Sequence, residues 1–232
     1  MQKWNGKMKA VTFSFDDGTI QDVRLVELLN KYGLKATFNL NSGYLGVRGQ
    51  EPWRGFSGFD HVSASMVKTL YEGHEIAVHT LTHCALNVQD EETIIRQVEE
   101  DRKALELLCG YDIVGLAYPW GARQEPVVEI IRTHTPIQYA RTAAQTFDFT
   151  LQRENLLIWD PSIYWISDCL EELVDRFLQI QSNEPQLLSI WGHSYELEQD
   201  PELIDWEKLE RIFQKLSGQT DIFYGTNKEV LL

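Results

Sequence analysis

The sequence has few cysteines and lacks long apolar runs. Its three cysteines, Cys84, Cys109 and Cys169, are scattered, odd in number and without C-x-x-C spacing, which excludes a disulfide framework. No stretch approaches the roughly 20 apolar residues of a membrane span, and the short polar N-terminus does not match a signal peptide. We therefore expect no membrane span, and a cytoplasmic rather than a secreted location.

Basic residues are also scarce. Lys and Arg number 21 against 35 Asp and Glu, so the formal net charge is −14. This balance argues against nucleic acid as the main partner, because phosphate binding needs clustered Lys and Arg. We find no linker, repeat or low-complexity tract, so one domain over residues 1–232 is expected. No feature of the sequence indicates an oligomeric state.

Short apolar runs alternate with longer amphipathic ones, which predicts an α/β fold of parallel strands, either closed into a barrel or open and doubly wound. The strands are expected at Met8–Phe15, Lys35–Leu40, Glu75–Val78, Ile113–Tyr118, Gln186–Trp191 and Asp221–Tyr224, with weaker patterns at Ile137–Arg141 and Leu156–Trp159. The helices are expected at Ile20–Tyr32, Ser63–Glu72, Asp90–Cys109, Glu125–His134, Ser167–Gln181 and Asp205–Leu216.

Side chains that could take part in catalysis or binding follow four of these strands. They are the pair Asp16-Asp17, His79, the segment Tyr118-Pro119-Trp120, and His193. In a parallel barrel the carboxyl ends of the strands form the face that carries active sites. The positions alone therefore predict a site that combines these groups.

The adjacent carboxylates Asp16 and Asp17 repel each other unless they share a cation or a proton. One could bind a metal ion while the other acts as a base; the alternative is a solvated loop turned by Gly18. An aspartyl phosphatase motif, D-x-D-G-T, is excluded because Phe15 stands where its first Asp belongs.

Histidines supply the other candidate groups. His79 and His83 form H-x-x-x-H, which on a helical turn puts two imidazoles on one face at a spacing that suits zinc. The zinc-protease form needs Glu where Thr80 stands, so the base lies elsewhere; the alternative is a structural pair. His193 is a candidate general acid, or a hydrogen-bonded loop histidine. No G-x-S-x-G elbow occurs, so a serine triad is not supported.

In these segments the chain resembles the polysaccharide deacetylase family (carbohydrate esterase family four, the NodB-type homology domain). The motifs occur in family order between about Lys9 and Glu196: F-D-D-G at Phe15, H-T-L-T-H at His79, Y-P-W-G at Tyr118, and the His193 segment. The resemblance implies a distorted (β/α)7-type barrel in a single domain. It also implies metal-dependent hydrolysis of an N-acetyl group, usually on an amino sugar.

The resemblance also implies roles for individual residues. Asp17, His79 and His83 would bind one divalent metal ion, with Zn2+ favoured and Co2+, Ni2+ or Mn2+ as alternatives. Asp16 would be the base that deprotonates the attacking water, and His193 would protonate the departing amine. The backbone N–H of Trp120 would stabilise the oxyanion. The residues expected to contact substrate are Tyr118, Pro119, Trp191 and Tyr195.

Two features depart from the family pattern. Ala117 stands where an arginine usually pairs with the base. Either the pKa of Asp16 is higher without that cation, or Arg141 or Arg153 supplies the charge, and we favour Arg141. The motif that orients the catalytic histidine is poorly formed, and Asp160 is its nearest candidate. The segment Gly43–His61 is long for a plain connection and is expected to be a specificity lid or a partner contact.

The expected substrate is an N-acetylated oligosaccharide, polysaccharide or sugar conjugate, or a small N-acyl compound. A second hypothesis keeps the barrel and the metal ion but changes the bond to a non-sugar amide, a cyclic amide or a ureide. A third is a catalytically degenerate protein that binds carbohydrate through its aromatic side chains.

Overall fold

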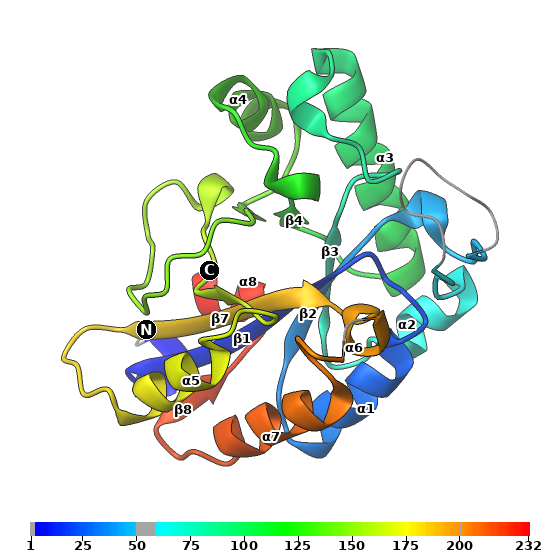
Figure 1. Ribbon diagram of the computed structural model, residues 1–232. Coiled ribbons are helices and arrows are strands. Elements are labelled where there is room, and N and C mark those ends of the chain that lie inside the picture. The colour runs from blue at the N-terminus through cyan, green and yellow to red at the C-terminus, as the bar shows by residue number, and fades with distance from the viewer. Residues whose placement is uncertain (1–2, 50–58, 200) are drawn as a thin grey trace.

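One all-parallel sheet organises the computed structural model, which describes residues 3–49, 59–199 and 201–232 (Figure 1). Its order is β5-β4-β3-β2-β1-β7-β6, and β8 pairs with the first half of β1. The strands are β1 (Lys9–Asp16), β2 (Ala36–Leu40), β3 (Glu75–Val78), β4 (Gly115–Ala117), β5 (Tyr139–Arg141), β6 (Ile163–Tyr164), β7 (Gln186–His193) and β8 (Ile222–Tyr224).

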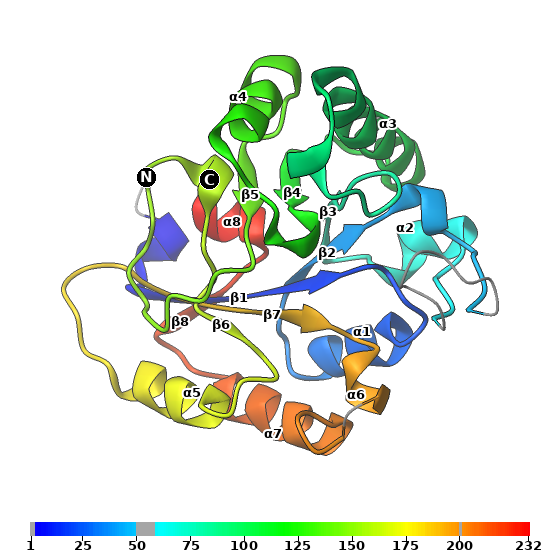
Figure 2. The same ribbon diagram turned by 45° about the horizontal axis from the view of Figure 1, so that its top comes forward.

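Helices pack around this sheet, with α3 and α4 together beside β3 and β4, and α1, α5 and α7 along the opposite part of the molecule (Figure 2). The helices are α1 (Asp22–Lys31), α2 (Val67–Leu70), α3 (Glu91–Cys109), α4 (Glu125–His134), α5 (Leu170–Gln179), α6 (Glu196–Gln199), α7 (Trp206–Leu216) and α8 (Asn227–Leu231). Short 3-10 turns are η1 (Lys3–Gly6), η2 (Ser42–Tyr44), η3 (Ala64–Met66), η4 (Leu86–Val88), η5 (Pro119–Gly121) and η6 (Leu156–Ile158). Among the described residues no helix combines the length and the apolar character that a membrane crossing needs.

The two ends of the sheet are linked by one continuous segment. Trp159 bridges to Arg141 at the end of β5, and a few residues later Ile163 pairs with Ile190 of β7. This link completes the distorted barrel that the sequence predicts, and the barrel alternative is confirmed. The strand predicted at Leu156–Trp159 is wrong: the left-handed Asn155 starts the 3-10 turn η6, and the strand forms later as β6.

The burial of the strands agrees with their order in the sheet. Every residue of β1 is buried, as a central strand requires, and Phe13, Phe15 and Phe38 pack on the helix side of the sheet. The long helix α3 is bounded as predicted, because the Asp90 side chain caps its first turn and Gly110 ends it with a φ of 84°.

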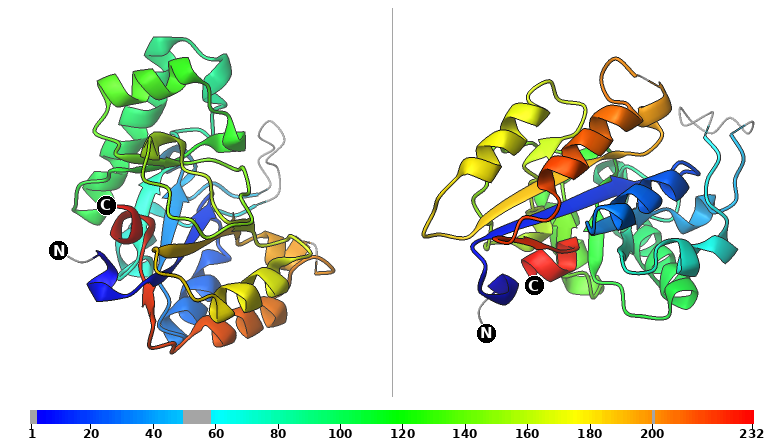
Figure 3. Two further views of the ribbon diagram at one scale, coloured as in Figure 1. Left: turned by 90° about the vertical axis from the view of Figure 1, so that its left-hand side faces the viewer. Right: turned by 90° about the horizontal axis from the view of Figure 1, so that it is seen from below.

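The C-terminal helix α8 closes the barrel at the amino ends of the strands, on the same side as the chain termini (Figure 3). The fully buried Asn227 receives a hydrogen bond from Thr12 at 2.9 Å and donates its backbone N–H to Thr37 at 2.8 Å. Polar residues of β1 and β2 therefore find their partners inside the barrel, which leaves the carboxyl ends of the strands free for a site.

Candidate active site

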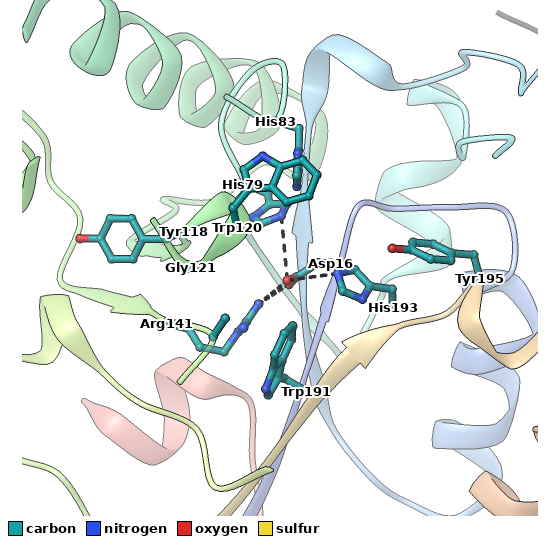
Figure 4. Close-up of a pocket in the computed structure, with 11 residues that line it drawn as sticks. Asp16, His79, His83, Tyr118, Trp120, Gly121, Arg141, Trp191, His193 and Tyr195 are labelled. Atoms are coloured by element: carbon teal, nitrogen blue, oxygen red, sulfur yellow. Dashed lines mark hydrogen bonds and ion pairs between the residues drawn. The ribbon is translucent and has the colours of Figure 1, made fainter. Parts of the chain in front are cut away.

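Neighbouring strands bring the predicted polar groups to one cavity at the carboxyl end of the barrel (Figure 4). Asp16 ends β1 and lies in register with His193, which ends β7, while His79 directly follows β3. The cavity has a volume of about 250 Å³. Its lining residues are Asp16, His79, His83, Tyr118, Trp120, Gly121, Arg141, Ala143, Trp191, His193 and Tyr195.

Three buried side chains form a group that could hold a metal ion. One ligand atom each from Asp17, His79 and His83 lies within 4.8 Å of the others. The Oδ1 atom of Asp17 is 3.5 Å from Nε2 of His79 and 3.6 Å from Nε2 of His83. Neither carboxylate oxygen of Asp17 has a hydrogen-bond partner in the described part of the chain, although both are buried. A buried carboxylate in this state is stabilised by a cation.

A backbone contact orients the His79 ring, and an irregular turn places His83 beside it. His79 Nδ1 lies 2.8 Å from the carbonyl of Ala117, so in the tautomer that donates there Nε2 presents its lone pair toward Asp17. The expected helical turn is absent: Thr80 and His83 have φ values of 63° and 51°, and residues 79–83 form an irregular turn. Asn41 holds this turn by donating to the carbonyls of His79 and Thr80.

Protonation states also fit a divalent cation. Burial lowers the pKa of His79 to about 4 and that of His83 to about 2, so both imidazoles are neutral at pH 7. Burial raises the pKa of Asp17 to about 7, because the opposing charge of His193 does not offset the loss of hydration and the neighbouring carboxylates. Two neutral imidazoles and one carboxylate are a donor set that zinc prefers. The residues therefore fit the ion that the sequence predicts.

Asp16 is held by a different set of groups. Arg141 donates from Nη2 to both of its carboxylate oxygens, at 2.5 Å to Oδ1, and Asn39 donates to the same Oδ1 at 2.8 Å. Burial alone would raise the pKa of Asp16, but the charges of Arg141, His79 and His193 outweigh it and hold the pKa at about 2. Asp16 is therefore an ionised carboxylate at neutral pH.

Arg141 reaches Asp16 from β5, the strand next to β4, which carries Ala117 at the position expected for the arginine. It is the register partner of Ala117 on the adjacent strands β5 and β4, so its side chain reaches the space that Ala117 leaves. Its Nε donates to Ser14 Oγ at 2.9 Å, and its guanidinium lies 4.7 Å from the ring centre of Trp191. Arg153, the other candidate, is exposed.

His193 faces the carboxylates across the cavity. Its Nε2 is 4.0 Å from Oδ2 of Asp16 and 4.0 Å from Oδ2 of Asp17. On the other side of the ring, Nδ1 lies 3.1 Å from Oε1 of Glu196. Burial alone would lower the pKa of His193, but the contact with Glu196 and the nearby Asp charges raise it to about 9. His193 is therefore an imidazolium at neutral pH.

The sequence analysis missed Glu196. Its Oε2 accepts the backbone N–H of His193 at 3.0 Å and the indole N–H of Trp165 at 2.6 Å, and Tyr164 donates to Oε1. A carboxylate three residues after a candidate histidine is a signal that could have indicated it. Asp160 does not take the orienting position proposed for it: it accepts from Thr142 and lies 3.7 Å from Arg123.

The aromatic residues divide into one exposed ring and several packed ones. Trp120 is 64% exposed and meets the His83 ring edge-on at 4.9 Å. Trp191 stacks on Tyr164 at 4.1 Å, and Tyr195 stacks on His193 at 5.1 Å. Trp120 thus presents the most open ring of the cavity wall.

The remaining two predicted contact residues lie deeper. Tyr118 lines the cavity but turns its hydroxyl away, toward the carbonyl of Leu157 at 3.0 Å (Figure 4). Pro119 is buried and does not line the cavity.

The predicted specificity segment Gly43–His61 starts and ends beside the site. A Cβ atom at Gly43 would lie 2.3 Å from the carbonyl oxygen of Leu81, so only glycine allows this approach to the histidine turn. Phe59, near its other end, stacks on Tyr195 at 4.0 Å. Trp53 and Phe56, two further aromatic residues of this segment, lie outside the described residues.

Comparisons with known proteins agree on fold and family. The polysaccharide deacetylase family model matches residues 3–136. A CE4-family pseudoenzyme from Bacillus anthracis superposes with a TM-score of 0.59 and 18% identity, covering 97% of this chain and 66% of that one. Its mutant "with restored enzymatic activity" gives a TM-score of 0.60 at 18% identity, covering 97% and 68%. The comparison with curated proteins found no match.

A CE4 domain of a multidomain xylanase, from the hindgut metagenome of Trinervitermes trinervoides, gives a TM-score of 0.58 at 18% identity. This alignment covers 96% of this chain and 89% of that one. These structural likenesses establish the barrel, and the family model covers more than half of the sequence. The chain belongs to the polysaccharide deacetylase family.

Proposed function

We propose that the chain is a metal-dependent hydrolase that removes an N-acetyl group from an amino sugar, an oligosaccharide or a polysaccharide. The observation that carries this proposal is that Asp16 and His193 lie together beside the Asp17–His79–His83 group, with His193 Nε2 4.0 Å from both aspartates. They are the ionised base and the protonated acid of one cavity. Two titratable groups with pKa values pushed apart indicate an acid–base pair.

Asp17, His79 and His83 would hold the ion. When bound, a divalent metal ion lowers the pKa of water toward about 7 and polarises the acyl carbonyl, which compensates for the weak basicity of Asp16. The buried, unpaired oxygens of Asp17 and the neutral imidazoles support this assignment.

Asp16 would accept a proton from the attacking water as the new C–O bond forms. Arg141 and Asn39 hold its carboxylate in place, so one proton-accepting geometry is maintained without reorganisation. Its low pKa keeps it ionised over the whole neutral range.

His193 would donate the second proton. As the C–N bond breaks, the leaving nitrogen takes the proton from Nε2, which points into the cavity while Nδ1 stays with Glu196. The backbone N–H of Trp120, in a turn with a φ of 61°, would stabilise the oxyanion. The products are acetate and the free amine.

The open ring of Trp120 supports a saccharide substrate, because aromatic faces at cavity mouths pack against sugar rings. The small cavity, about 250 Å³, supports the second candidate, a compact cyclic amide or ureide.

Acetate release separates these functions. We expect the zinc-loaded protein to release acetate from N-acetylated oligosaccharides, and Asp16→Asn to lose turnover while retaining the metal ion. Turnover of cyclic amides alone would favour the second candidate. Sugar binding without turnover of any substrate would identify a degenerate protein.

A further inference from the structure

A second hollow, of about 400 Å³, adjoins the active-site cavity. The two share His83 and Trp120 as walls, so a ligand that passes the exposed Trp120 ring enters the second hollow. The remaining wall residues are Thr82, Cys84, Ala85, Val88, Gln89, Thr93, Arg96 and Gln97.

The charge of this wall is opposite to that of the chain as a whole. Arg96 lines it and no carboxylate does, although the formal net charge of the protein is −14. The Arg96 side chain is exposed and makes no ion pair or hydrogen bond with the described residues, although its charge acts on the exposed Asp90 carboxylate at the start of the same helix. This holds even though Glu92 and Glu100 stand four residues away on the same helix, a spacing that permits ion pairs.

The other polar groups of the wall are partly engaged with one another. Gln97 donates to Thr82 Oγ1 at 2.9 Å and accepts the backbone N–H of Thr82 at 3.1 Å. Glu99 follows Arg96 on α3 but does not line the hollow. It is paired with Arg102 at 2.7 Å and with Lys103 at 3.3 Å, so it does not neutralise Arg96. Asp90 does not line the hollow, and none of the Arg96 donors is hydrogen-bonded to a described residue, so these donors are available to a ligand.

We propose that Arg96 binds an anionic substituent on the unit next to the acetylated one, so that the substrate is an acidic N-acetylated saccharide. This proposal rests on the function proposed above. A guanidinium presents a planar fork of donors that matches a carboxylate or a phosphate. Because the net charge of the protein repels anions at a distance, recognition must come from this local contact.

Binding measurements on zinc-loaded Asp16→Asn test the proposal without turnover. The first ligand pair is a hyaluronan tetrasaccharide and its carboxyl-reduced form; the second is diacetylchitobiose with and without a 6-phosphate on one sugar. We expect at least one acidic ligand to bind about three- to tenfold more tightly than its neutral partner, and more weakly as salt increases.

Variants on the same helix assign the effect. Adding Arg96→Gln should remove the preference for the acidic ligand, whereas adding Lys103→Gln, which changes the net charge equally, should preserve it. Equal binding within both pairs, or a preference that survives Arg96→Gln, would overturn the proposal. The proposed function has its own test: it would be refuted if the zinc-loaded wild type released no acetate from any substrate. The two failures are therefore distinct.

Discussion

Arg141, at the end of β5, donates to both carboxylate oxygens of Asp16, at the end of β1, and both side chains are buried. Ala117, at the usual family position of this arginine, lies beside Arg141 in the β4–β5 register. The guanidinium thus reaches Asp16, the proposed base, from the neighbouring strand. This relationship holds Asp16 as an ionised, hydrogen-bonded carboxylate.

Replacing Arg141 with Met should lower kcat by about 100-fold, because it leaves a buried carboxylate without its cation. Without the guanidinium the pKa of Asp16 rises from about 2 toward neutrality. The acid limb of the rate profile should therefore move to higher pH, because Asp16 becomes protonated sooner as the pH falls. Rate profiles from pH 4 to 8 measure the shift. Arg123→Gln removes a partly exposed cation near Asp160 and should leave the profile in place. An unchanged profile in Arg141→Met would contradict the assignment.

Replacing Glu196 with Gln should move the alkaline limb of the rate profile to lower pH by about one unit or more. Against the effect of burial, Glu196 and the charges of Asp17 and Asp16 together raise the pKa of His193 to about 9. Removal of the Glu196 charge therefore lets the imidazolium lose its proton earlier as the pH rises. The matched control is Glu198→Gln, on the same short helix but bonded to Gln21. If both variants gave the wild-type limb, Glu196 would not act through His193.

Replacing Trp120 with Ala should raise KM about fivefold and change kcat less, because the variant loses the exposed ring but keeps the backbone N–H. Steady-state kinetics on an N-acetylated oligosaccharide measure both constants. Phe147→Ala removes another exposed aromatic, 44% exposed and outside the cavity lining, and should change neither. A fall in kcat with constant KM would show that the ring acts in the chemical step.

Replacing Ser14 with Ala should lower both stability and kcat. The Ser14 hydroxyl accepts from Arg141 Nε and from Asn39 Nδ2 at 2.9 Å each. Its loss leaves the buried Nε of Arg141 without this acceptor, at about 1–3 kcal/mol, while Asn39 still donates to Asp16. Urea unfolding measures the stability. Ser189→Ala, on β7, disrupts buried hydrogen bonds to Ser162 and should cost stability without affecting kcat. Equal kcat losses in the two variants would show a general effect of core damage.

Much of the fold follows from sequence patterns because periodicity and capping are local. The helix Asp90–Cys109 and the strand Glu75–Val78 were predicted with bounds close to those observed. The strand at Ile163–Tyr164 was not predicted, and one was wrongly expected at Leu156–Trp159. A strand of only two residues, β6, carries no periodic signal.

The composition of the candidate site was predicted, and so was one of its supporting contacts, that of Arg141 with Asp16. Asp16, Asp17, His79, His83 and His193 stand at strand ends and in spaced motifs, which sequence reasoning detects. Glu196 was missed because its role depends on the turn after β7, where the side chain folds back onto its own histidine. Arg141 was favoured as the partner of Asp16 only because the resemblance placed Ala117 where the family has an arginine, and the structure shows this contact. The β4–β5 register that brings Arg141 there is something a single sequence indicates only weakly.

The metal content of the purified protein, measured by elemental analysis, tests the central claim most directly. We predict close to one equivalent of zinc or a similar divalent ion in the wild type, and its loss when His79→Ala and His83→Ala are combined. The same variant should still fold, as circular dichroism checks. A wild type that binds no metal even after reconstitution, or a double variant that retains it, would contradict the account.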